Sequence, residues 1–222
     1  MQSQAIEDYL KAIYELQGAQ VQVGTSLLAE WLGVTPASVT GMLKKLAEMK
    51  LVVYAPYQGV KLTRAGQRIA LEVIRHHRLV ERFLAEALGV PWDRVHEEAH
   101  KIEHVLSEDL EDRMDALLGH PATDPHGAPI PRADGTIDAS ASARLAELQA
   151  GQSAVVAQVS DHDAALLRYL GELGLYPQSS VTVKAIAPFD GLMTIQVGNK
   201  QHALSPAVAN EIFVADIKGK VF

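Results

Sequence analysis

The hydrophobic pattern of this chain changes character once, across a stretch rich in proline, glycine and aspartate over residues 119–140. Before that stretch, apolar residues recur at the three- and four-residue spacing of amphipathic helices. After Leu145 they form short runs rich in β-branched residues. Such a proline- and glycine-rich stretch is expected to be a linker or an extended loop. We therefore predict a mainly α-helical first part followed by a small β domain, within a length of 222 residues that allows two or three domains.

The first 66 residues carry, in order, the signals of a winged helix-turn-helix. Apolar spacing predicts helices over 4–17 and 25–32. Thr35 and Pro36 then supply an N-cap and a first-turn proline for a third helix that runs to about residue 49. Two β-rich runs, 51–55 and 60–63, flank a Pro56–Gly59 turn and predict a hairpin.

In a helix-turn-helix, the N-terminal end of the second helix faces base edges in the major groove of DNA. The side chains at this end of the third predicted helix are small and hydroxylated, so none can make a bidentate base contact. Direct readout should be modest, and DNA shape should add specificity. The lysines and the hairpin would bind phosphates, although a merely solvated helix face is the alternative. The candidate DNA-contacting residues are Thr35, Pro36, Ala37, Ser38, Thr40, Gly41, Lys44, Lys45, Tyr57 and Lys61.

Further helices are predicted over 64–88 and 92–118, the second with a possible break near Ser107. The last part holds four β-type runs, AVVAQV, VTVKAI, LMTIQV and EIFVADI, with the short helix ALLRYLGELG between the first two. Short strands of this kind predict a small, partly closed barrel. The predicted domains are residues 1–66, 67–140 and 141–222.

Histidines concentrate in residues 76–104, where His96, His100, Glu103 and His104 have the i, i+4, i+7 and i+8 spacing of one helical face. On the preceding predicted helix, His77 and Glu81 lie one turn apart. Imidazole and carboxylate ligands without thiolates suit a divalent transition metal. Taken singly, each histidine could instead be an ordinary surface or core residue.

Two metal clusters are predicted rather than one, because residues on a helical stripe need not share one ion. His96 could meet His77 and Glu81 across the helix pair. The second cluster, His100, Glu103 and His104, would need another ligand. Asp8 points away from the apolar face of the first helix and could complete that cluster. A ligand there would connect the DNA-reading helices to the metal, as a switch requires.

Composition narrows the function classes further. The absence of cysteine excludes disulfides, zinc–thiolate sites and iron–sulfur clusters. No apolar run reaches membrane-spanning length, and the N-terminus has acids where a signal peptide is basic, so we expect a cytoplasmic protein without a membrane partner. The net charge of −7 gathers in residues 65–140, while residues 35–64 are locally basic.

Two other functions compete with metal-controlled DNA binding. A mononuclear metallohydrolase would need an open metal position, a general base and a substrate pocket beside the metal. A metal buffer or chaperone would have no use for a winged helix. We therefore expect no enzyme activity and no small organic substrate.

With these residues in hand, the chain resembles the diphtheria toxin repressor and manganese transport regulator family of metal-dependent transcription regulators. The resemblance covers nearly the whole chain. Its markers are EDYLKAIYEL at 7–16, VTPASVTGMLKKLAEMKLV at 34–52, LT-x-x-G at 62–66, RHHRLVERFL at 75–84, VHEEAHKIEHVLSEDLEDRM at 95–114 and DPHGAPIP at 124–131. The C-terminal part looks like the SH3-like, FeoA-type domain of longer members. The resemblance implies a homodimeric repressor of metal-homeostasis genes that binds a double-stranded operator when metal is loaded.

The resemblance also implies two metal sites per subunit. The residues that match the family's primary site are Asp8, His100, Glu103 and His104, and those that match its ancillary site are His77, Glu81 and His96. Gln158 and Asp161 lie nearest to the further ancillary ligands of the SH3-like domain, with His162 as a rival.

Two departures from the family's patterns bear on the metal. Position 100 is histidine instead of cysteine or glutamate, and position 8 is aspartate as in manganese-type members. Loss of sulfur ligands favours Mn²⁺, and the added imidazole makes Fe²⁺ the alternative. Lys11 stands where manganese-type members can supply a second carboxylate, so a binuclear primary site is not expected.

Overall fold

The computed structural model describes residues 3–18, 22–138 and 142–219. The chain divides into two compact units. The first unit comprises residues 1–77, 102–107 and 131–137, and the second comprises 78–101, 108–130 and 138–222. Each unit is described separately below. The predicted boundary at 140/141 lies outside the described residues, so the division into 1–66, 67–140 and 141–222 stays a prediction.

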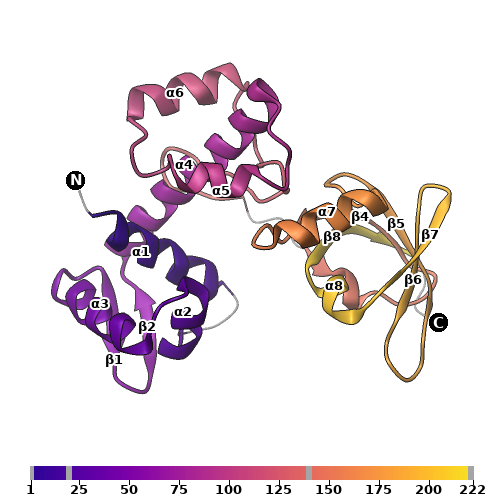
Figure 1. The fold of residues 1–222 in the computed structure, drawn as a ribbon, viewed down its shortest axis with the longest axis horizontal. Coiled ribbons are helices and arrows are strands. Elements are labelled where there is room, and N and C mark those ends of the chain that lie inside the picture. Colours follow the sequence, from indigo (N-terminus) through magenta and orange to yellow (C-terminus); the bar gives the residue numbers. More distant parts are fainter. Residues whose placement is uncertain (1–2, 19–21, 139–141, 220–222) are drawn as a thin grey trace. The chain divides into compact units, whose positions relative to one another are not determined.

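The first unit contains the helix-turn-helix and its wing. Its elements are α1 (Gln4–Gln17), α2 (Thr25–Leu32), α3 (Pro36–Glu48), β1 (Val52–Ala55) and β2 (Gly59–Leu62). The hairpin pairs antiparallel with Val52 opposite Leu62, and Val23 forms an additional bridge to Val60. The three helices and the hairpin lie together (Figure 1). They share one apolar core built around Leu10, Ile13, Leu28, Leu43 and Leu46. The predicted winged helix-turn-helix is confirmed.

Local chemistry explains where α3 begins. The Thr35 side chain accepts a hydrogen bond from the Ser38 backbone N–H at 3.2 Å, and Pro36 occupies the first turn. Before it, Gly33 ends α2 in a left-handed conformation with φ of 64°. These signals act over a few residues, so the end of α2 and the start of α3 could both be predicted from the sequence.

Helix α4 (Arg64–Leu88) is continuous and passes from the first unit to the second after His77. Thr63 precedes it, and its hydroxyl accepts a hydrogen bond from the Gly66 N–H at 3.2 Å. The bounds predicted for this helix are confirmed.

The helical stretch predicted over 92–118, with a break near Ser107, is two helices, α5 (Val95–His100) and α6 (Glu108–Leu117). The predicted break is confirmed, but it is longer than expected, because the chain is not helical from residue 101 to residue 107. Glu103 explains it: its carbonyl lies 3.3 Å from His76 Nδ1 and its carboxylate contacts Lys11, so contacts in the first unit replace helical hydrogen bonds. Glu103 and His104 thus lie on a turn and not on a helical stripe.

The stretch predicted as a linker is folded over much of its length in the second unit. Thr123 and Pro129 form a bridge, and Asp124 Oδ1 accepts hydrogen bonds from the backbone of His126 and Ala128 at 2.8 and 3.0 Å. The loop lies against the last domain, where the Val159 N–H donates to the His126 carbonyl at 2.9 Å. Residues 121–130 are therefore a structural element with buried polar side chains.

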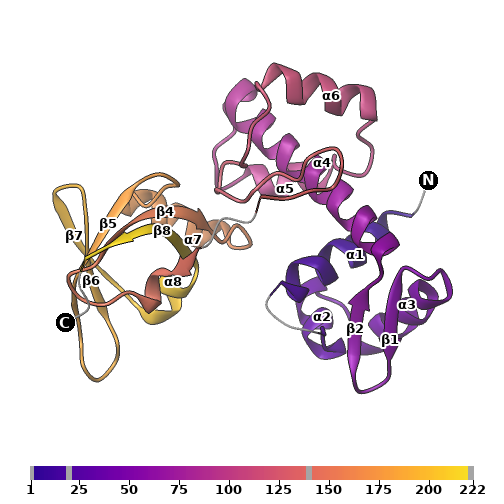
Figure 2. The ribbon, with the colours of Figure 1, turned by 180° about the vertical axis from the view of Figure 1, so that it is seen from behind.

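The C-terminal part of the second unit is a six-stranded antiparallel sheet with strand order β3-β8-β4-β5-β6-β7 (Figure 2). Its elements are β3 (Ala143–Arg144), a 3₁₀ turn (Leu145–Glu147), β4 (Ser153–Val159), α7 (Ala164–Leu173), β5 (Ser180–Ile186), β6 (Met193–Val197), β7 (Lys200–Leu204), α8 (Pro206–Asn210) and β8 (Ile212–Lys218). The sheet and α7 enclose a second core around Leu167, Leu170, Val181, Ile195 and Val214. The predicted class, mainly α with a β C-terminal domain, is confirmed. The strand β7 was not predicted, because KQHAL is polar and lies at the sheet edge.

No helix in the described part of the chain is both long and apolar enough to cross a bilayer.

Candidate metal centre

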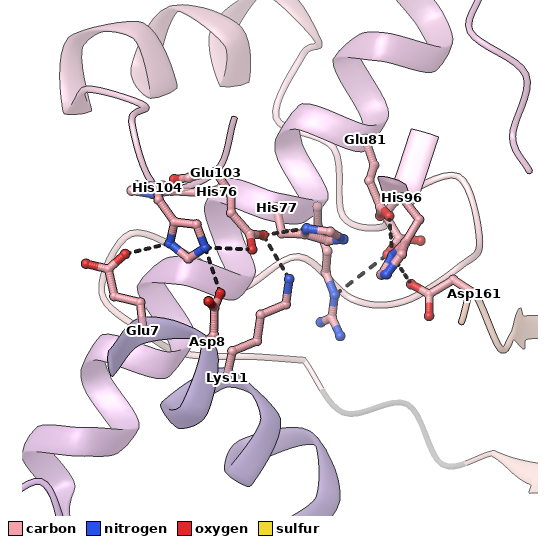
Figure 3. A network of polar contacts seen from close by, with 12 residues as sticks. Glu7, Asp8, Lys11, His76, His77, Glu81, His96, Glu103, His104 and Asp161 are labelled. Carbon is pink, nitrogen blue, oxygen red and sulfur yellow. Dashed lines mark hydrogen bonds and ion pairs between the residues drawn. The ribbon is translucent and has the colours of Figure 1, made fainter. Parts of the chain in front are cut away.

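A first cluster of ligand-type side chains lies in the first unit, and we call Glu7, Asp8, Glu103 and His104 the first centre (Figure 3). His104 Nδ1 lies 2.7 Å from Glu7 Oε2, and its Nε2 lies 2.8 Å from Asp8 Oδ1 and 3.2 Å from Glu103 Oε1. Helix α1 carries the first two carboxylates, and the turn after α5 carries the other two residues. The centre thus joins two segments far apart in the sequence.

Glu103 is the most enclosed member of the first centre, with 1% of its surface exposed. Its Oε1 faces His104, while its Oε2 lies 2.8 Å from Lys11 Nζ and 2.5 Å from His77 Nδ1. A buried carboxylate is stable only when it is paired and hydrogen-bonded, and these contacts meet that need.

In the absence of an ion, the carboxylates of the first centre stabilise the protonated form of the His104 imidazole. Burial lowers the pKa of His104, but contacts with Glu103 and Glu7, and the charge of Asp8, outweigh it and raise the pKa to about 9. A metal ion requires the neutral imidazole, so ion binding at this centre must displace a proton. The same negative field that attracts the proton attracts a divalent cation.

A second cluster lies entirely within the second unit, and we call Glu81, His96, Asp124, His126 and Asp161 the second centre. His96 Nδ1 lies 3.1 Å from Glu81 Oε1 and 3.4 Å from Asp161 Oδ2 (Figure 3). His126 Nδ1 lies 3.8 Å from Glu81 Oε2 and 4.0 Å from Asp161 Oδ2. Ligand atoms of Glu81, Asp124, His126 and Asp161 all lie within 4.8 Å of one another.

Burial makes the second centre a suitable site for a cation. Glu81, Asp124 and His126 are at most 1% exposed. Among the described residues, Asp124 Oδ2 and His126 Nδ1 are buried polar atoms without a hydrogen-bond partner. Such atoms are costly unless something pairs with them. Burial and the charge of Glu81 raise the pKa of Asp124 to about 7, because both disfavour the charged carboxylate. A bound cation would offset this unfavourable free energy.

His126 is oriented for a ligand role by its other ring nitrogen. Its Nε2 lies 2.7 Å from the Trp92 carbonyl, which can only accept a hydrogen bond. The proton is therefore on Nε2, and in the neutral ring the Nδ1 lone pair faces the carboxylates. Burial lowers the pKa of His126, but the contact with Glu81 and the nearby carboxylates raise it to about 9. An ion at this centre would also replace a proton.

His96 has the same electrostatic character. Burial lowers its pKa, and hydrogen bonds with Asp161 and Glu81 raise it to about 10. The His162 ring packs edge-on against the His96 ring with centroids 5.6 Å apart. Asp161 in turn has a lowered pKa, because the contact with His96 overcomes the effect of burial.

The structure sorts the predicted ligands between the two units. Asp8, Glu103 and His104 lie together in the first centre, and Glu81, His96 and Asp161 lie together in the second. The other predicted ligands are His77, which belongs to the first unit and turns to Glu103, His100, which ends α5 in the second unit, and Gln158, which lies on β4 opposite Phe213. The ligand roles of His77, His100 and Gln158 stay predictions.

Sequence reasoning missed Asp124 and His126, because they lie in the stretch taken as a linker. The signal that could have found them is the run Asp-Pro-His-Gly, which places two ligand-type side chains in a tight turn. Their burial depends on contacts with α4 and β4, which the local sequence does not encode.

The candidate DNA-contacting surface is exposed on the first unit. Ser38 and Gly41 on α3, the lysines that follow them and Lys61 on β2 are all exposed, and Tyr57 stands fully exposed at the hairpin turn. The hydroxyl of Thr40 donates to the Pro36 carbonyl at 2.9 Å, and the Thr35 and Ser38 hydroxyls lie 2.9 Å apart. These local hydrogen bonds use the Thr40 hydroxyl hydrogen and one of the two hydroxyl hydrogens of Thr35 and Ser38, so few donors are left for bases, which fits modest direct readout.

Family models match along almost all of the chain. Residues 1–60 match the N-terminal DNA binding domain of the iron dependent repressors, and residues 63–132 match their metal binding and dimerisation domain. Residues 143–216 match the FeoA domain.

Whole-chain relatives agree with these matches. The iron-dependent repressor IdeR of Mycobacterium tuberculosis (strain ATCC 25618 / H37Rv) is 34% identical over 224 residues, covering 95% of this chain and 96% of the relative. A solved manganese-dependent transcriptional repressor in complex with manganese is 38% identical with a TM-score of 0.89, covering 94% of this chain and 98% of that one. The manganese regulator SloR is 32% identical with a TM-score of 0.80, covering 97% and 98%. This chain therefore belongs to the diphtheria toxin repressor and manganese transport regulator family of metal-dependent transcription regulators.

Proposed function

We propose that this protein is a cytoplasmic, manganese-activated repressor of metal-homeostasis genes, with Fe²⁺ as the alternative activator and two metal sites per subunit. As a family member it is a metal-dependent DNA-binding regulator with a dimerisation domain, and it is not an enzyme. The proposal extends this to the metal, the ligands and the genes.

The observation that carries the proposal is the position of the first centre. Glu7 and Asp8 project from α1, and the other side of α1 packs in the same core as α2 and α3. Glu103 and His104 approach those carboxylates from the turn after α5. A divalent ion there would supply the positive charge that three carboxylates need, and the residues would hold α1 in one orientation. The helix-turn-helix would then be ordered before it meets DNA.

The donor set supports manganese as the first choice. Carboxylate oxygens dominate both centres, and the sequence contains no cysteine, so the ligands are oxygen and nitrogen only. Oxygen-rich sites suit Mn²⁺, while each imidazole shifts preference toward later metals such as Fe²⁺. Two of the similar solved structures are named as manganese-dependent transcriptional repressors, while curated relatives such as IdeR are named as iron-dependent repressors. His100, predicted to complete the first centre, would supply one more imidazole.

In the second unit we propose Glu81, Asp124, His126 and Asp161 as ligands of the other ion, with His96 at its edge. This set replaces the sequence-based set of His77, Glu81 and His96, because it includes two buried atoms without hydrogen-bond partners. Arg78 Nε lies 3.7 Å from Asp124 Oδ2 and holds that carboxylate in place.

The test is a mobility-shift assay with operator DNA from upstream regions of metal-transport genes. Binding should rise by at least about 100-fold when apo-protein is loaded with Mn²⁺, by analogy with a population shift of a few kcal/mol. A chelator should reverse it. Metal binding without any change in DNA binding would favour a buffer or chaperone, and DNA binding unaffected by chelator would refute the metal switch. Titration with Mn²⁺ and with Fe²⁺ under anaerobic conditions ranks the two metals.

Lys44→Ala should weaken binding to all DNA sequences and lower the salt dependence of affinity, by about one unit in the slope of log K against log salt for each lost phosphate contact. Lys44 is exposed on α3, so its ammonium can contact a DNA phosphate without a rearrangement of other side chains. Lys200→Ala on β7 is the matched control, because Lys200 is equally exposed and is not among the DNA candidates. Equal salt slopes for the two variants would remove Lys44 from the DNA-contacting set.

A further inference from the structure

Trp92 contacts both the second centre and the C-terminal domain, and all of these residues belong to the second unit. It lies in the turn between α4 and α5, where the Arg94 N–H donates to the Pro91 carbonyl at 2.8 Å. Its ring centroid is 5.8 Å from that of His126, with an angle of 32° between the two planes. Its backbone carbonyl is 2.7 Å from His126 Nε2. One residue therefore contacts this imidazole twice, through its ring and through its main chain.

The C-terminal domain holds the same indole in place. The Tyr176 ring packs on it with centroids 4.6 Å apart, and Trp92 also packs against the core of that domain. The next residue, Asp93, accepts a hydrogen bond from Arg168 of α7 at 3.1 Å, but the Arg168 side chain is 59% exposed. An ion pair with an exposed arginine stabilises little, whereas packed aromatic rings stabilise beyond the area that they bury. The indole therefore anchors this turn more firmly than the ion pair does.

Helix α7 leaves room for these rings because residue 171 is glycine. A Cβ on Gly171 would lie 2.8 Å from the Tyr176 hydroxyl oxygen and 3.4 Å from Trp92 Nε1. Glycine inside a helix is less favourable than alanine, so it needs a reason in the packing. The reason here is the close approach of α7 to the two aromatic side chains.

The Trp92 carbonyl decides which nitrogen of His126 can bind an ion. A carbonyl only accepts hydrogen bonds, so it keeps the proton of the neutral ring on Nε2 and leaves the Nδ1 lone pair for the ion. In the described part of the chain, Nδ1 is a buried atom without a hydrogen-bond partner, 3.8 Å from Glu81 Oε2. If the carbonyl moved, the ring would lose the contact that sets both its orientation and its tautomer.

We infer that Trp92 is a positioning residue for the second centre: its indole, packed against both His126 and the C-terminal domain, holds the carbonyl that orients the His126 ligand. The inference rests on the proposed role of His126 as a metal ligand. It gives the C-terminal domain a second contribution to this centre, through Tyr176 and Gly171, besides the carboxylate of Asp161.

The test compares full-length variants in a His104→Ala background, in which only the second centre should bind Mn²⁺. In equilibrium dialysis, Trp92→Ala should lower the affinity for that ion by about 10–100-fold, the usual effect of losing a group that orients a metal ligand. Trp92→Phe retains a ring against His126 and Tyr176 and should recover most of the affinity. Trp31→Ala removes the other tryptophan of the chain, on α2 in the first unit, and should leave the affinity unchanged.

A spectroscopic measurement separates positioning from a general loss of stability. In protein with ¹⁵N-labelled histidine, loaded with the diamagnetic ion Zn²⁺, NMR reports which nitrogen of His126 carries the proton. His126→Gln assigns the signal by its absence. The wild type should show a proton on Nε2 that exchanges slowly with solvent, and Trp92→Ala should show much faster exchange. A variant that was only less stable would keep the slow exchange in its folded molecules.

Gly171→Ala keeps the test valid if Trp92→Ala does not fold, which circular dichroism of the apo-protein would reveal. Its methyl group would press on the Tyr176 hydroxyl and on the indole without changing Trp92 itself. The affinity for the second ion should fall, by a smaller factor than in Trp92→Ala. Alanine favours a helix more than glycine does, so the weaker binding could not come from a weakened α7.

The outcomes separate this inference from the proposed function. If His126→Gln leaves the affinity for the second ion unchanged, the proposed ligand set fails. If His126→Gln weakens the ion, but folded Trp92→Ala and Gly171→Ala both bind it as tightly as the parent with slow exchange at Nε2, then only the role of Trp92 is wrong.

Discussion

His104→Ala should abolish metal-stimulated DNA binding while the protein stays folded. His104 is the hub of the first centre, within 3.2 Å of Glu7, Asp8 and Glu103. Without its imidazole, Glu7, Asp8 and Glu103 would lose the nitrogen-bearing ring that all three contact. Loss of a residue that only supports a ligand already lowers metal affinity 10–100-fold, so loss of this one should lower it by about 100-fold or more. Operator affinity in Mn²⁺ should fall to the metal-free value.

The measurement is operator binding by fluorescence anisotropy across a Mn²⁺ titration, with thermal unfolding of the apo-protein as the folding check. His104 pairs with three carboxylates, so the apo variant should lose about 1–3 kcal/mol of stability but should still unfold in one cooperative transition. His120→Ala is the matched control, because His120 is an exposed histidine that contacts Asp115 Oδ2 at 2.9 Å, away from the first centre in sequence. A wild-type metal response in His104→Ala would mean that the first centre is not the activating site.

Gly127→Ala should destabilise the second unit by about 2–4 kcal/mol and remove one bound ion. Gly127 has φ of 90°, a conformation that L side chains rarely adopt, and a Cβ there would lie 2.0 Å from the Ala157 carbonyl oxygen. The loop must therefore move away from β4. That movement withdraws Asp124 and His126 from Glu81, so the second centre should lose its ion.

Calorimetry gives the stability change, and equilibrium dialysis gives the number of bound ions. Gly151→Ala is the control that introduces backbone strain without a steric clash, since Gly151 has φ of 88° but no atom lies within 4 Å of its added Cβ. It should cost about 1 kcal/mol and keep the full metal count. Equal effects of the two substitutions would show that the close approach to β4 does not matter.

The parts of the fold that could be predicted are those with local causes. The bounds of α1, α2 and α4 follow from apolar spacing and from residues such as Thr63 and Gly33 at their ends. The hairpin follows from two β-rich runs around a turn. Each of these signals acts within a few residues, so no tertiary information is needed.

The errors come from contacts distant in sequence. The helical stripe ends at His100 because Glu103 bonds instead with Lys11, His76 and His77. A local pattern cannot weigh a buried ion pair against continued helix. For the same reason the run around His126 read as a linker, although Glu81 on α4 and Asp161 after β4 make it part of a buried cluster.

The second centre also has a consequence for the chain as a polymer. Glu81, His126 and Asp161 come from a helix, a loop and the C-terminal domain, and the sequence contains no cysteine. An ion held by them would close chain loops as a disulfide does, and a loop of roughly 80 residues corresponds to about 4 kcal/mol of chain entropy in the unfolded state. A disulfide is broken by a reductant. This cross-link would persist under reducing conditions and would be lost only when the concentration of the ion falls. Resistance of the C-terminal domain to unfolding would then follow the free metal concentration in the cell.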